Sequence, residues 1–526
     1  MGTIDKLIRG TSTTGNLFDT VNGLVDSIKE IDKGLADPVV TPDTDVNYYI
    51  SAGQSLSIGY TDLANTTINT GILDNVYLYN GVPAIAPASD ESITPADVTS
   101  LVPFSQPTRE THIYSMLSTL METAGGTWIV APQGRGGQRL INLNRGTEPF
   151  NNGVVMHDGA AAAATSLSKN IKMPFFTFIQ GESDVSADED WYENEIKTYY
   201  SDMVMLHADL SGESPPMFTT QIGTSGSISF ASRELDISNN NGNIYCAGPN
   251  WAIARLYPSS SVDYTHLNPE GYVILGKMLA QSINEVVYKG NTDYKPMQPK
   301  SIQVSNDVAS IDFHTPDGQV VIDTTTFPEA PSLGIQYRLG VGVALQADQW
   351  SLNGNTLTMQ FGNEGQPLVV GGLISGGNTL TDHSTTDGIP VPLVNLRTSK
   401  STIDGWEDWC CQFAIPVTKE MGAIDPETDN IWTYGSPTID NLTGFATVLG
   451  TSSCYFLDGN TYQVDYDSAE ITTGSVRLWV GDESHTINPA GGSLIMTRGS
   501  SKRLRLQSAG DGFQGRVLNL RITKAS

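Results

Sequence analysis

The stretch MPFFTFIQ (residues 173–180) decides the fold class of this chain. It is an almost continuous apolar run, and a strand that is apolar on both faces is typical of a parallel sheet covered by helices. GESD (residues 181–184) follows directly, so polar side chains stand at the end of this strand. We therefore expect an α/β domain with a buried strand here.

Strands and helices alternate around this run, from residue 45 to residue 292. The expected strands are 47–52, 127–132, 216–223 and 243–248, and the expected helices are 111–126, 188–210 and 268–287. The last helix has Pro269 in its first turn, where proline is well tolerated. This alternation predicts a parallel sheet with helices on both faces.

Two regions of different pattern flank the α/β region. In residues 1–44, apolar residues recur at heptad spacing, which predicts either a helix docked on its own domain or a short coiled coil that joins subunits. They are Leu17, Val21, Leu24, Ile28, Ile31 and Leu35. After residue 292, polar and apolar residues alternate between glycine turns, which predicts antiparallel β-sandwich domains over 293–417 and 418–526.

Composition excludes several classes of ligand. The 526-residue chain has a formal net charge of −28, so it should repel nucleic acids and anionic membranes. Its four cysteines show no metal-ligand spacing, and no stretch reaches the roughly 20 apolar residues of a membrane span. MGTIDKLIRGTSTTGN (residues 1–16) lacks the apolar core of a signal peptide, so we expect synthesis in a cytoplasm without ordinary export.

The motif ISAGQSLSIG (residues 50–59) places Ser55 directly after a strand and a glycine. A strand-to-helix turn there exposes a hydroxyl at the carboxyl edge of the sheet, where open α/β sheets bind ligands. The N–H groups of such a turn can face a developing oxyanion. For this motif alone, an ordinary turn serine is the simpler interpretation.

The motif VDYTHLNPEGY (residues 262–272) places Asp263 three residues before His266, on a predicted loop that enters a helix. A carboxylate at this spacing can accept a hydrogen bond from one imidazole nitrogen, which leaves the other nitrogen free to take a serine proton. Alternatively, Asp263 only caps a turn. The remaining histidines show no ligand pattern and are expected to be structural.

A third motif, FIQGESDV (residues 178–185), ends the apolar strand. Gly181 allows backbone to approach the sheet edge closely, and Gln180 and Ser183 offer hydrogen-bond donors there. Glu182 and Asp184 are both able to cap the following helix, and for Asp184 we expect this role.

Together, the blocks GQS, QGESD and DxxHLNPxGY resemble the SGNH (GDSL-like) hydrolase superfamily over residues 45–290. They are closest to its sialate O-acetylesterase and acetylxylan-esterase-like branch. The resemblance implies a flavodoxin-like three-layer domain and a serine esterase mechanism without metal or cofactor. It implies Ser55 as nucleophile, His266 as general base and Asp263 as the carboxylate that orients it.

The same resemblance implies an oxyanion hole built from the Ser55 N–H and a backbone N–H of APQGRGGQR (residues 131–139), at Gly136 or Gly137. Ser183 stands where the wider superfamily has asparagine, so Gln180 or the Ser183 N–H are alternative third donors. Gln54 and Glu182 are candidate substrate-binding residues.

The last domain resembles jelly-roll carbohydrate-binding modules, and the whole chain resembles bacteriophage tail-spike or tail-fibre deacetylases. This implies a virion-borne, trimeric enzyme that removes O-acetyl groups from a bacterial surface polysaccharide and contacts other tail proteins. The alternatives are a secreted bacterial esterase acting on plant or host glycans, and an inactive glycan-binding protein. Trp432 and Trp479 are expected in a sandwich core, with sugar stacking as the alternative.

Overall fold

The computed structural model describes residues 45–417 apart from short gaps, the longest being 62–67, 83–91, 362–370 and 376–392. Within 430–524 it describes the backbone of the strands. The predicted heptad helix of residues 17–35, the side chains of Trp432 and Trp479, and His383 lie outside the described residues, so the expectations for them stay predictions.

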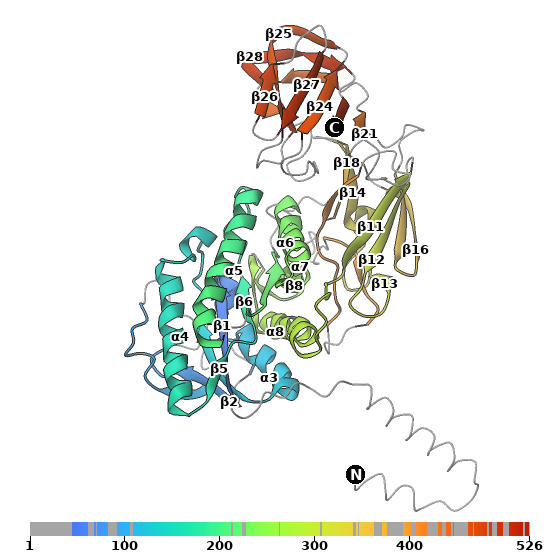
Figure 1. Cartoon of the computed structure of the whole chain (residues 1–526). Helices are drawn as coiled ribbons and strands as arrows, with labels where there is room; N and C mark the ends of the chain where they lie inside the picture. Colours follow the sequence, from blue (N-terminus) through green and yellow to red (C-terminus); the bar gives the residue numbers. More distant parts are fainter. Residues whose placement is uncertain are drawn as a thin grey trace, which may run out of the picture. The chain divides into compact units, whose positions relative to one another are not determined.

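A sheet of eight described strands forms the centre of the α/β region (Figure 1). The strands are β1 (Asp45–Gly53), β2 (Ile72–Tyr79), β3 (Leu101–Ser105), β4 (Thr127–Pro132), β5 (Asn170–Lys172), β6 (Phe176–Ile179), β7 (Met217–Gln221) and β8 (Ile244–Pro249). Their order is β3–β2–β4–β1–β6–β7–β8, with β5 paired to β1. All neighbours are parallel except β2 and β3. The predicted parallel sheet is confirmed, and the antiparallel edge strand β3 is an addition to it.

Helices cover both faces of this sheet. The α-helices of the described part are α3 (His112–Ala124), α4 (Glu148–Ser166), α5 (Glu189–Ser211), α6 (Ile228–Asn240), α7 (Asn250–Leu256) and α8 (Pro269–Ile283). Trp128 and Val130 of β4 lie in one apolar core with α3 and α8, whereas Ile129 and Ala131 lie in a second core with α4 and α5. Since alternate strand residues point to opposite faces, the sheet is the middle layer of three, and the flavodoxin-like fold class is confirmed.

The antiparallel region after the α/β domain contains two described four-stranded sheets. One has the order β11 (Gln298–Ser305), β12 (Val308–His314), β17 (Thr356–Phe361), β16 (Ala347–Asn353), and the other the order β15 (Val343–Leu345), β14 (Ile335–Leu339), β18 (Gly371–Ser375), β20 (Ala414–Val417). Gln221 at the end of β7 exchanges two hydrogen bonds with the backbone of Gln412, at 2.8 and 2.7 Å. The β region is thereby joined to the α/β sheet by buried polar contacts.

Strands between residues 430 and 524 form two further antiparallel sheets, drawn in orange and red in Figure 1. One has the order β21 (Asn430–Thr433), β29 (Arg521–Lys524), β24 (Thr461–Tyr466), β27 (Gly492–Thr497); the other has the order β22 (Thr438–Leu442), β28 (Leu504–Leu518), β25 (Ser468–Val480), β26 (Glu483–Thr486). The predicted antiparallel β domains are confirmed as a fold class. Their boundaries at 292 and 417 stay predictions.

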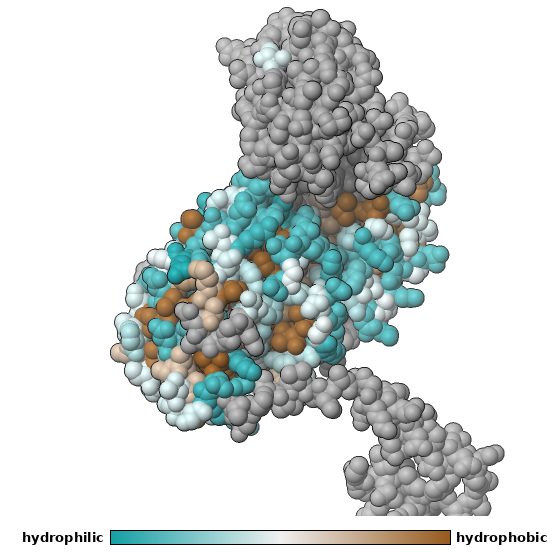
Figure 2. All heavy atoms as spheres, in the orientation of Figure 1, coloured by the Kyte–Doolittle hydropathy of each residue, from teal (hydrophilic) through white to brown (hydrophobic). Residues whose placement is uncertain are grey.

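The described surface is mainly hydrophilic on the face in Figure 2, with apolar side chains in small separate patches. Tyr60 is one of the large apolar side chains exposed on the described part, at 39% of its surface. No described helix is both long and apolar enough to span a bilayer.

Candidate active site

Ser55 lies in a tight turn at the carboxyl end of the central strand β1. Gly53 has φ +125°, and a Cβ atom there would lie 2.0 Å from the carbonyl oxygen of Ile179, so only glycine fits this close approach of β1 to β6. The Gln54 N–H donates to the same carbonyl at 2.9 Å. Ser55 then begins the short 3₁₀ helix η1 (Ser55–Ile58). The turn therefore holds the serine at the sheet edge predicted from the sequence.

Asp263 and His266 lie on the short strand β10 (Asp263–Leu267), which pairs irregularly with β9 (Pro258–Ser260). The sequence predicted a loop here. Helix α8 begins directly after this strand, and the Asn268 side chain caps it by accepting from the N–H of Gly271 at 2.9 Å. The strand and the capped helix together fix the main chain on both sides of the histidine.

The structure brings the three residues of the predicted triad into one chain of hydrogen bonds. Ser55 Oγ lies 2.8 Å from His266 Nε2, although 211 positions separate them. His266 Nδ1 lies 2.7 Å from Asp263 Oδ2. The other carboxylate oxygen of Asp263 accepts from the N–H groups of Thr265 and His266, at 2.9 and 3.2 Å. The carboxylate is thus fixed on one side and bound to the imidazole on the other.

Hydrogen bonding keeps the Asp263 carboxylate ionised. Burial raises the pKa of Asp263, but the hydrogen bonds from the His266 ring and from the two backbone N–H groups outweigh burial and leave the pKa below its ordinary value. The side chains of His266 and Asp263 are 21% and 19% exposed, so the imidazole is reachable from solvent. An ionised carboxylate at Nδ1 favours the tautomer in which Nε2 can accept a proton from Ser55.

The glycine-rich segment after β4 packs against the turn that holds Ser55. The Arg135 N–H donates to the carbonyl of Gly53 at 2.8 Å. A Cβ on Gly134 would lie 1.9 Å from Ser57 Oγ, and one on Gly136 would lie 3.9 Å from the Cβ of Ser55, whereas one on Gly137 would meet nothing within 4 Å. Of the two glycines offered by the sequence, Gly136 is therefore the one that adjoins the serine.

The candidates Gln54, Gln180 and Ser183 take part in two separate sets of hydrogen bonds close to the end of β6. Gln54 Oε1 accepts from the Ser183 N–H at 3.2 Å. Gln180 Nε2 donates to Asp184 at 2.5 Å, and the Tyr192 hydroxyl donates to Gln180 Oε1 at 2.8 Å. The Ser183 N–H is thus engaged with Gln54, while the Ser183 hydroxyl has no hydrogen-bond partner among the described residues.

The expectation that Asp184 caps the following helix is wrong. Asp184 accepts hydrogen bonds from Arg139 Nε at 2.8 Å and from the Leu140 N–H at 2.7 Å, so it ties the glycine-rich segment to the end of β6. Helix α5 begins only at Glu189, and Asp188 accepts from the N–H of Trp191 at 3.1 Å. The helix starts too far along the chain for Asp184 to reach its first turn.

Glu182 is a partly buried acid that precedes the candidate Ser183. Burial raises the pKa of Glu182 to about 7, although hydrogen bonds from its own N–H and from that of Gly223 act in the opposite direction. Its Oε2 atom is buried without a hydrogen-bond partner among the described residues. No hydrogen bond joins this carboxyl group to Ser55, Asp263 or His266 in the described structure.

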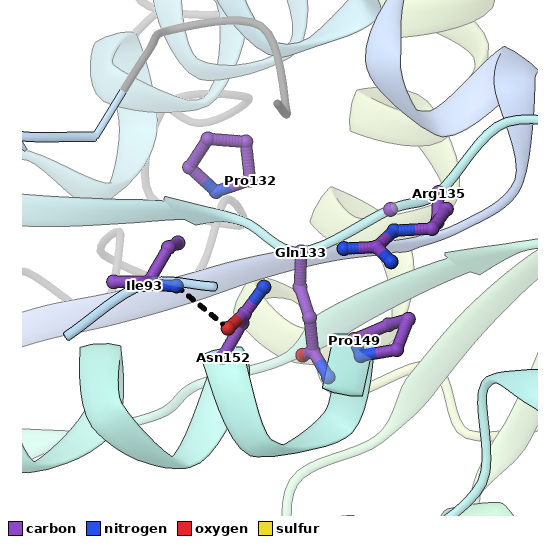
Figure 3. A pocket seen from close by; sticks show the side chains of 7 residues that line it. Ile93, Pro132, Gln133, Arg135, Pro149 and Asn152 are labelled. Atoms are coloured by element: carbon purple, nitrogen blue, oxygen red, sulfur yellow. Dashed lines mark hydrogen bonds between the residues drawn. The ribbon is translucent and has the colours of Figure 1, made fainter. Parts of the chain in front are cut away.

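A small pocket lies beside the glycine-rich segment, between the end of β4 and the start of α4 (Figure 3). Gln133 points from β4 toward α4, and Asn152 accepts from the Ile93 N–H at 2.9 Å. Arg135 is paired with Glu148 at 2.9 Å. Within the described residues, no group of histidines, cysteines and carboxylates is arranged to hold a metal ion.

Sequence reasoning missed Tyr60, whose ring lies beside His266 with the ring centroids 4.5 Å apart. Its N–H donates to the carbonyl of Ser55 at 3.1 Å, and its carbonyl accepts from the hydroxyl of Tyr272. Tyr60 directly follows the ISAGQSLSIG motif, so its position in the sequence was a usable signal.

Comparisons with known proteins give no match to a family model and none to a curated protein sequence. Solved structures with weak similarity include a carbohydrate acetylesterase from Xanthomonas citri, at 12% identity and TM-score 0.46 over 68% of this chain and 81% of that one. NanS matches at 12% identity and TM-score 0.35, over 47% of this chain and 98% of that one. A tail fibre protein from an E. coli phage matches at 10% identity and TM-score 0.28, over 91% of this chain and 69% of that one. Because these similarities are weak, the function is inferred from the residues of this chain.

Proposed function

We propose that this protein is a serine ester hydrolase that removes O-acetyl groups from a carbohydrate. The observation that carries the proposal is the continuous chain from Ser55 Oγ through His266 to Asp263, with links of 2.8 and 2.7 Å. Nucleophile, base and orienting carboxylate in hydrogen-bond contact are the signature of an activated serine.

In the proposed mechanism, Ser55 Oγ attacks the ester carbonyl carbon while His266 Nε2 takes the hydroxyl proton. The resulting oxyanion accepts hydrogen bonds from the N–H groups of Ser55 and Gly136. The N–H of Ser55 begins a 3₁₀ helix and therefore has no partner within it. Losing one such donor typically costs about 3–4 kcal/mol of transition-state stabilisation.

His266 then gives its proton to the oxygen of the leaving alcohol, and the C–O bond of the ester breaks. Water, deprotonated by His266, attacks the acyl-enzyme and releases the acid and free Ser55. Asp263 stays ionised throughout and stabilises the imidazolium that forms in each half-reaction. Its lowered pKa supports this role.

The carbohydrate part of the proposal rests on the resemblance of the GQS, QGESD and DxxHLNPxGY blocks to the acetylesterase branch of SGNH hydrolases. The antiparallel β domains are compatible with glycan binding. A secreted bacterial esterase would have the same chemistry on plant or host glycans. An inactive glycan-binding protein would bind sugars without releasing acetate.

Ser55→Ala tests the activity directly. The variant is expected to lose hydrolysis of 4-nitrophenyl acetate and acetate release from acetylated bacterial polysaccharides, with an unchanged melting temperature. Ser57→Ala is a nearby control, because the Ser57 hydroxyl donates to the Gln54 carbonyl at 2.6 Å and not to the histidine. Full turnover by folded Ser55→Ala would remove this serine as the nucleophile.

We further propose that the chain is a trimeric component of a phage tail spike or fibre. The heptad spacing of residues 17–35 and the antiparallel β domains support this. Light scattering on the intact chain at micromolar concentration is expected to give three times the mass of one chain. A monomer mass would contradict the proposed trimer but would leave the proposed esterase activity unaffected.

A further inference from the structure

Two cysteines from distant parts of the sequence meet at the edge of the α/β sheet. Cys246 lies on β8, the last strand in the described order of that sheet, and Cys411 lies in the segment before β20 of the β region. Together with Leu235 of α6 they form a small buried cluster, in which Cys246 is 3% and Cys411 0% exposed. Two sulfur-bearing side chains therefore link the two regions at this point.

The two thiol groups are in contact. The Cys411 thiol makes a hydrogen bond with that of Cys246, and both residues are free thiols in the structure. Burial, followed by this hydrogen bond, raises the pKa of Cys411. Since the thiolate is the form that attacks a disulfide, the buried pair is expected to react slowly while the protein stays folded.

Hydrogen bonds fix the main chain around Cys411 from both regions. The Cys411 N–H donates to the carbonyl of Met297, directly before β11, at 2.9 Å. On the other side, Gln221 of β7 exchanges hydrogen bonds of 2.8 and 2.7 Å with the backbone of Gln412. Because β7 pairs with β8, the same sheet positions Cys246. The contact between the thiols is thus set by anchored main chain on both sides.

The neighbouring thiol of Cys410 has a different environment. Cys410 belongs to the large core that also contains Trp251, and its Sγ donates to the carbonyl of Cys411 at 3.3 Å. The carbonyl of Cys410 accepts from the indole N–H of Trp251 at 3.0 Å. Of these two adjacent cysteines, Cys411 is therefore the one that packs against Cys246.

We propose that Cys246 and Cys411 are a disulfide-forming pair that fastens the β region to the α/β domain in an oxidising medium. This inference is independent of the proposed esterase activity. A disulfide needs Cα atoms within about 7 Å and converging side chains, and two thiols in contact on anchored main chains favour both conditions. The bond closes a loop that contains Asp263 and His266, so it also restrains the segment that carries the proposed base.

The oxidation is balanced with a low-molecular-weight disulfide, such as oxidised glutathione, as the electron acceptor. One cysteine thiolate attacks this disulfide, releases one glutathione thiolate and forms a mixed disulfide. The second cysteine thiolate then displaces the other glutathione, so the protein loses two protons and two electrons and two reduced glutathione molecules form. In a reducing compartment the same exchange runs backwards and keeps both thiols free.

The test compares the oxidised and reduced forms of the intact chain. The reduced protein is unfolded in urea and refolded at about pH 8.5 in a buffer of reduced and oxidised glutathione, where thiolates are populated. Where refolding is incomplete, diamide, a small diazene that takes up two hydrogen atoms to become a hydrazine, oxidises the folded chain. The oxidised protein is expected to melt about 5 °C or more above the same protein after reduction. This comparison needs no variant.

Peptide mapping after alkylation of the free thiols identifies the partners. Cys410 and Cys411 are adjacent and fall in one peptide, so variants must separate them. The link to the Cys246 peptide and the rise in melting temperature are expected to persist in Cys410→Ala, the matched control, and to be lost in Cys411→Ala.

Three results would overturn the inference. They are four alkylated cysteines after oxidation, a link that persists in Cys411→Ala or joins Cys454, and a link between the expected partners that leaves the melting temperature unchanged or lower. Turnover of 4-nitrophenyl acetate by both forms keeps the two proposals apart. A protein that is inactive in both forms would count against the esterase alone.

Discussion

Asp263 in the α/β region and Asp323 in the antiparallel β region are held in the same way but face different partners. In each, Oδ1 accepts from the backbone N–H groups two and three residues further on, at 2.9 and 3.2 Å for Asp263 and 2.8 Å twice for Asp323. In each, Oδ2 accepts from a nitrogen-bearing side chain, His266 at 2.7 Å and Arg397 at 2.6 Å. Hydrogen bonds hold the pKa of both carboxyl groups below its usual value despite burial.

The two aspartates differ in the chemistry that is open to their partner side chains, His266 and Arg397. His266 turns its second ring nitrogen to Ser55, and a neutral imidazole can accept a proton at that nitrogen. The guanidinium of Arg397 has donor groups and no acceptor, and its Nη1 donates to the carbonyl of Thr398 at 2.9 Å. The same carboxylate motif therefore orients the base of the proposed mechanism in one region and binds a strand arginine in the other. A lowered pKa by itself does not distinguish the two roles.

Asp263→Asn should act on turnover and leave stability nearly intact. The amide can present an N–H to Nδ1, which favours the wrong imidazole tautomer and stabilises the imidazolium poorly. Comparable triads lose about 10⁴-fold in kcat on this change. The measurement is kcat for an acetate ester together with the thermal melting temperature. A loss under tenfold would mean that Asp263 only shapes the turn before α8.

The sequence predicted the α/β fold from its alternating pattern, and it singled out Ser55, Asp263 and His266 through the resemblance of their motifs to SGNH hydrolases. An Asp and a His three positions apart lie close enough for contact on almost any turn, and Ser55 follows a strand and a glycine. Asp323 and Arg397 are 74 positions apart, so only the tertiary fold reveals their pairing.

Helix α4 (Glu148–Ser166) was also missed in the sequence. The segment NNGVVMHDGAAAAATS (residues 151–166) lacks the apolar spacing of an amphipathic helix, and four of its seven buried residues are glycines or alanines: Gly153, Gly159, Ala160 and Ala164. A Cβ on Gly159 would lie 2.7 Å from the side chain of Val98, so the close packing of this helix face requires a small residue here. Periodicity of large apolar residues does not detect such a face.

Buried histidines should make the α/β region lose stability in mild acid. The stabilisation by the hydrogen bonds of Asp323 in the β region should be lost only at lower pH. Burial lowers the pKa of His112 and of His207 to about 3. The unfolded chain takes up these protons below about pH 6.5, whereas the folded chain does not until near pH 3, so stability is complete above pH 6.5 and falls on acidification. Each histidine is expected to remove about 1.4 kcal/mol per pH unit in this window. Urea midpoints between pH 7 and pH 4.5 measure the slope.

His207→Gln provides the matched comparison for this slope. The ring of His207 packs against Tyr48 and His157. The variant is therefore expected to be less stable at pH 7, and its free energy of unfolding is expected to change less with pH. Limited proteolysis near pH 4.5 should cut the α/β region before residues 298–417. An unchanged slope in His207→Gln, or earlier cleavage of the β region, would contradict the assignment of the acid sensitivity to this histidine.

Asp323→Asn should have the opposite profile to Asp263→Asn, with loss of stability and normal turnover by the folded protein. Asp323 is nearly fully buried and also accepts from the hydroxyls of Thr325 and Thr326, both at 3.0 Å. The amide keeps part of this set but loses the charge opposite Arg397, and its NH₂ group meets donors. We expect a loss of about 2 kcal/mol in the free energy of unfolding, the scale of a hydrogen bond to a charged group.

Because the pKa of Asp323 is lowered, this contribution is complete above about pH 4 and disappears as the carboxyl group protonates at lower pH. Urea unfolding at pH 7 gives the difference, and Asp348→Asn, an exposed site on β16, is the control with no expected change. A variant with normal stability and reduced turnover would show that the β region contributes to catalysis, and the contrast between the two carboxylates would then fail.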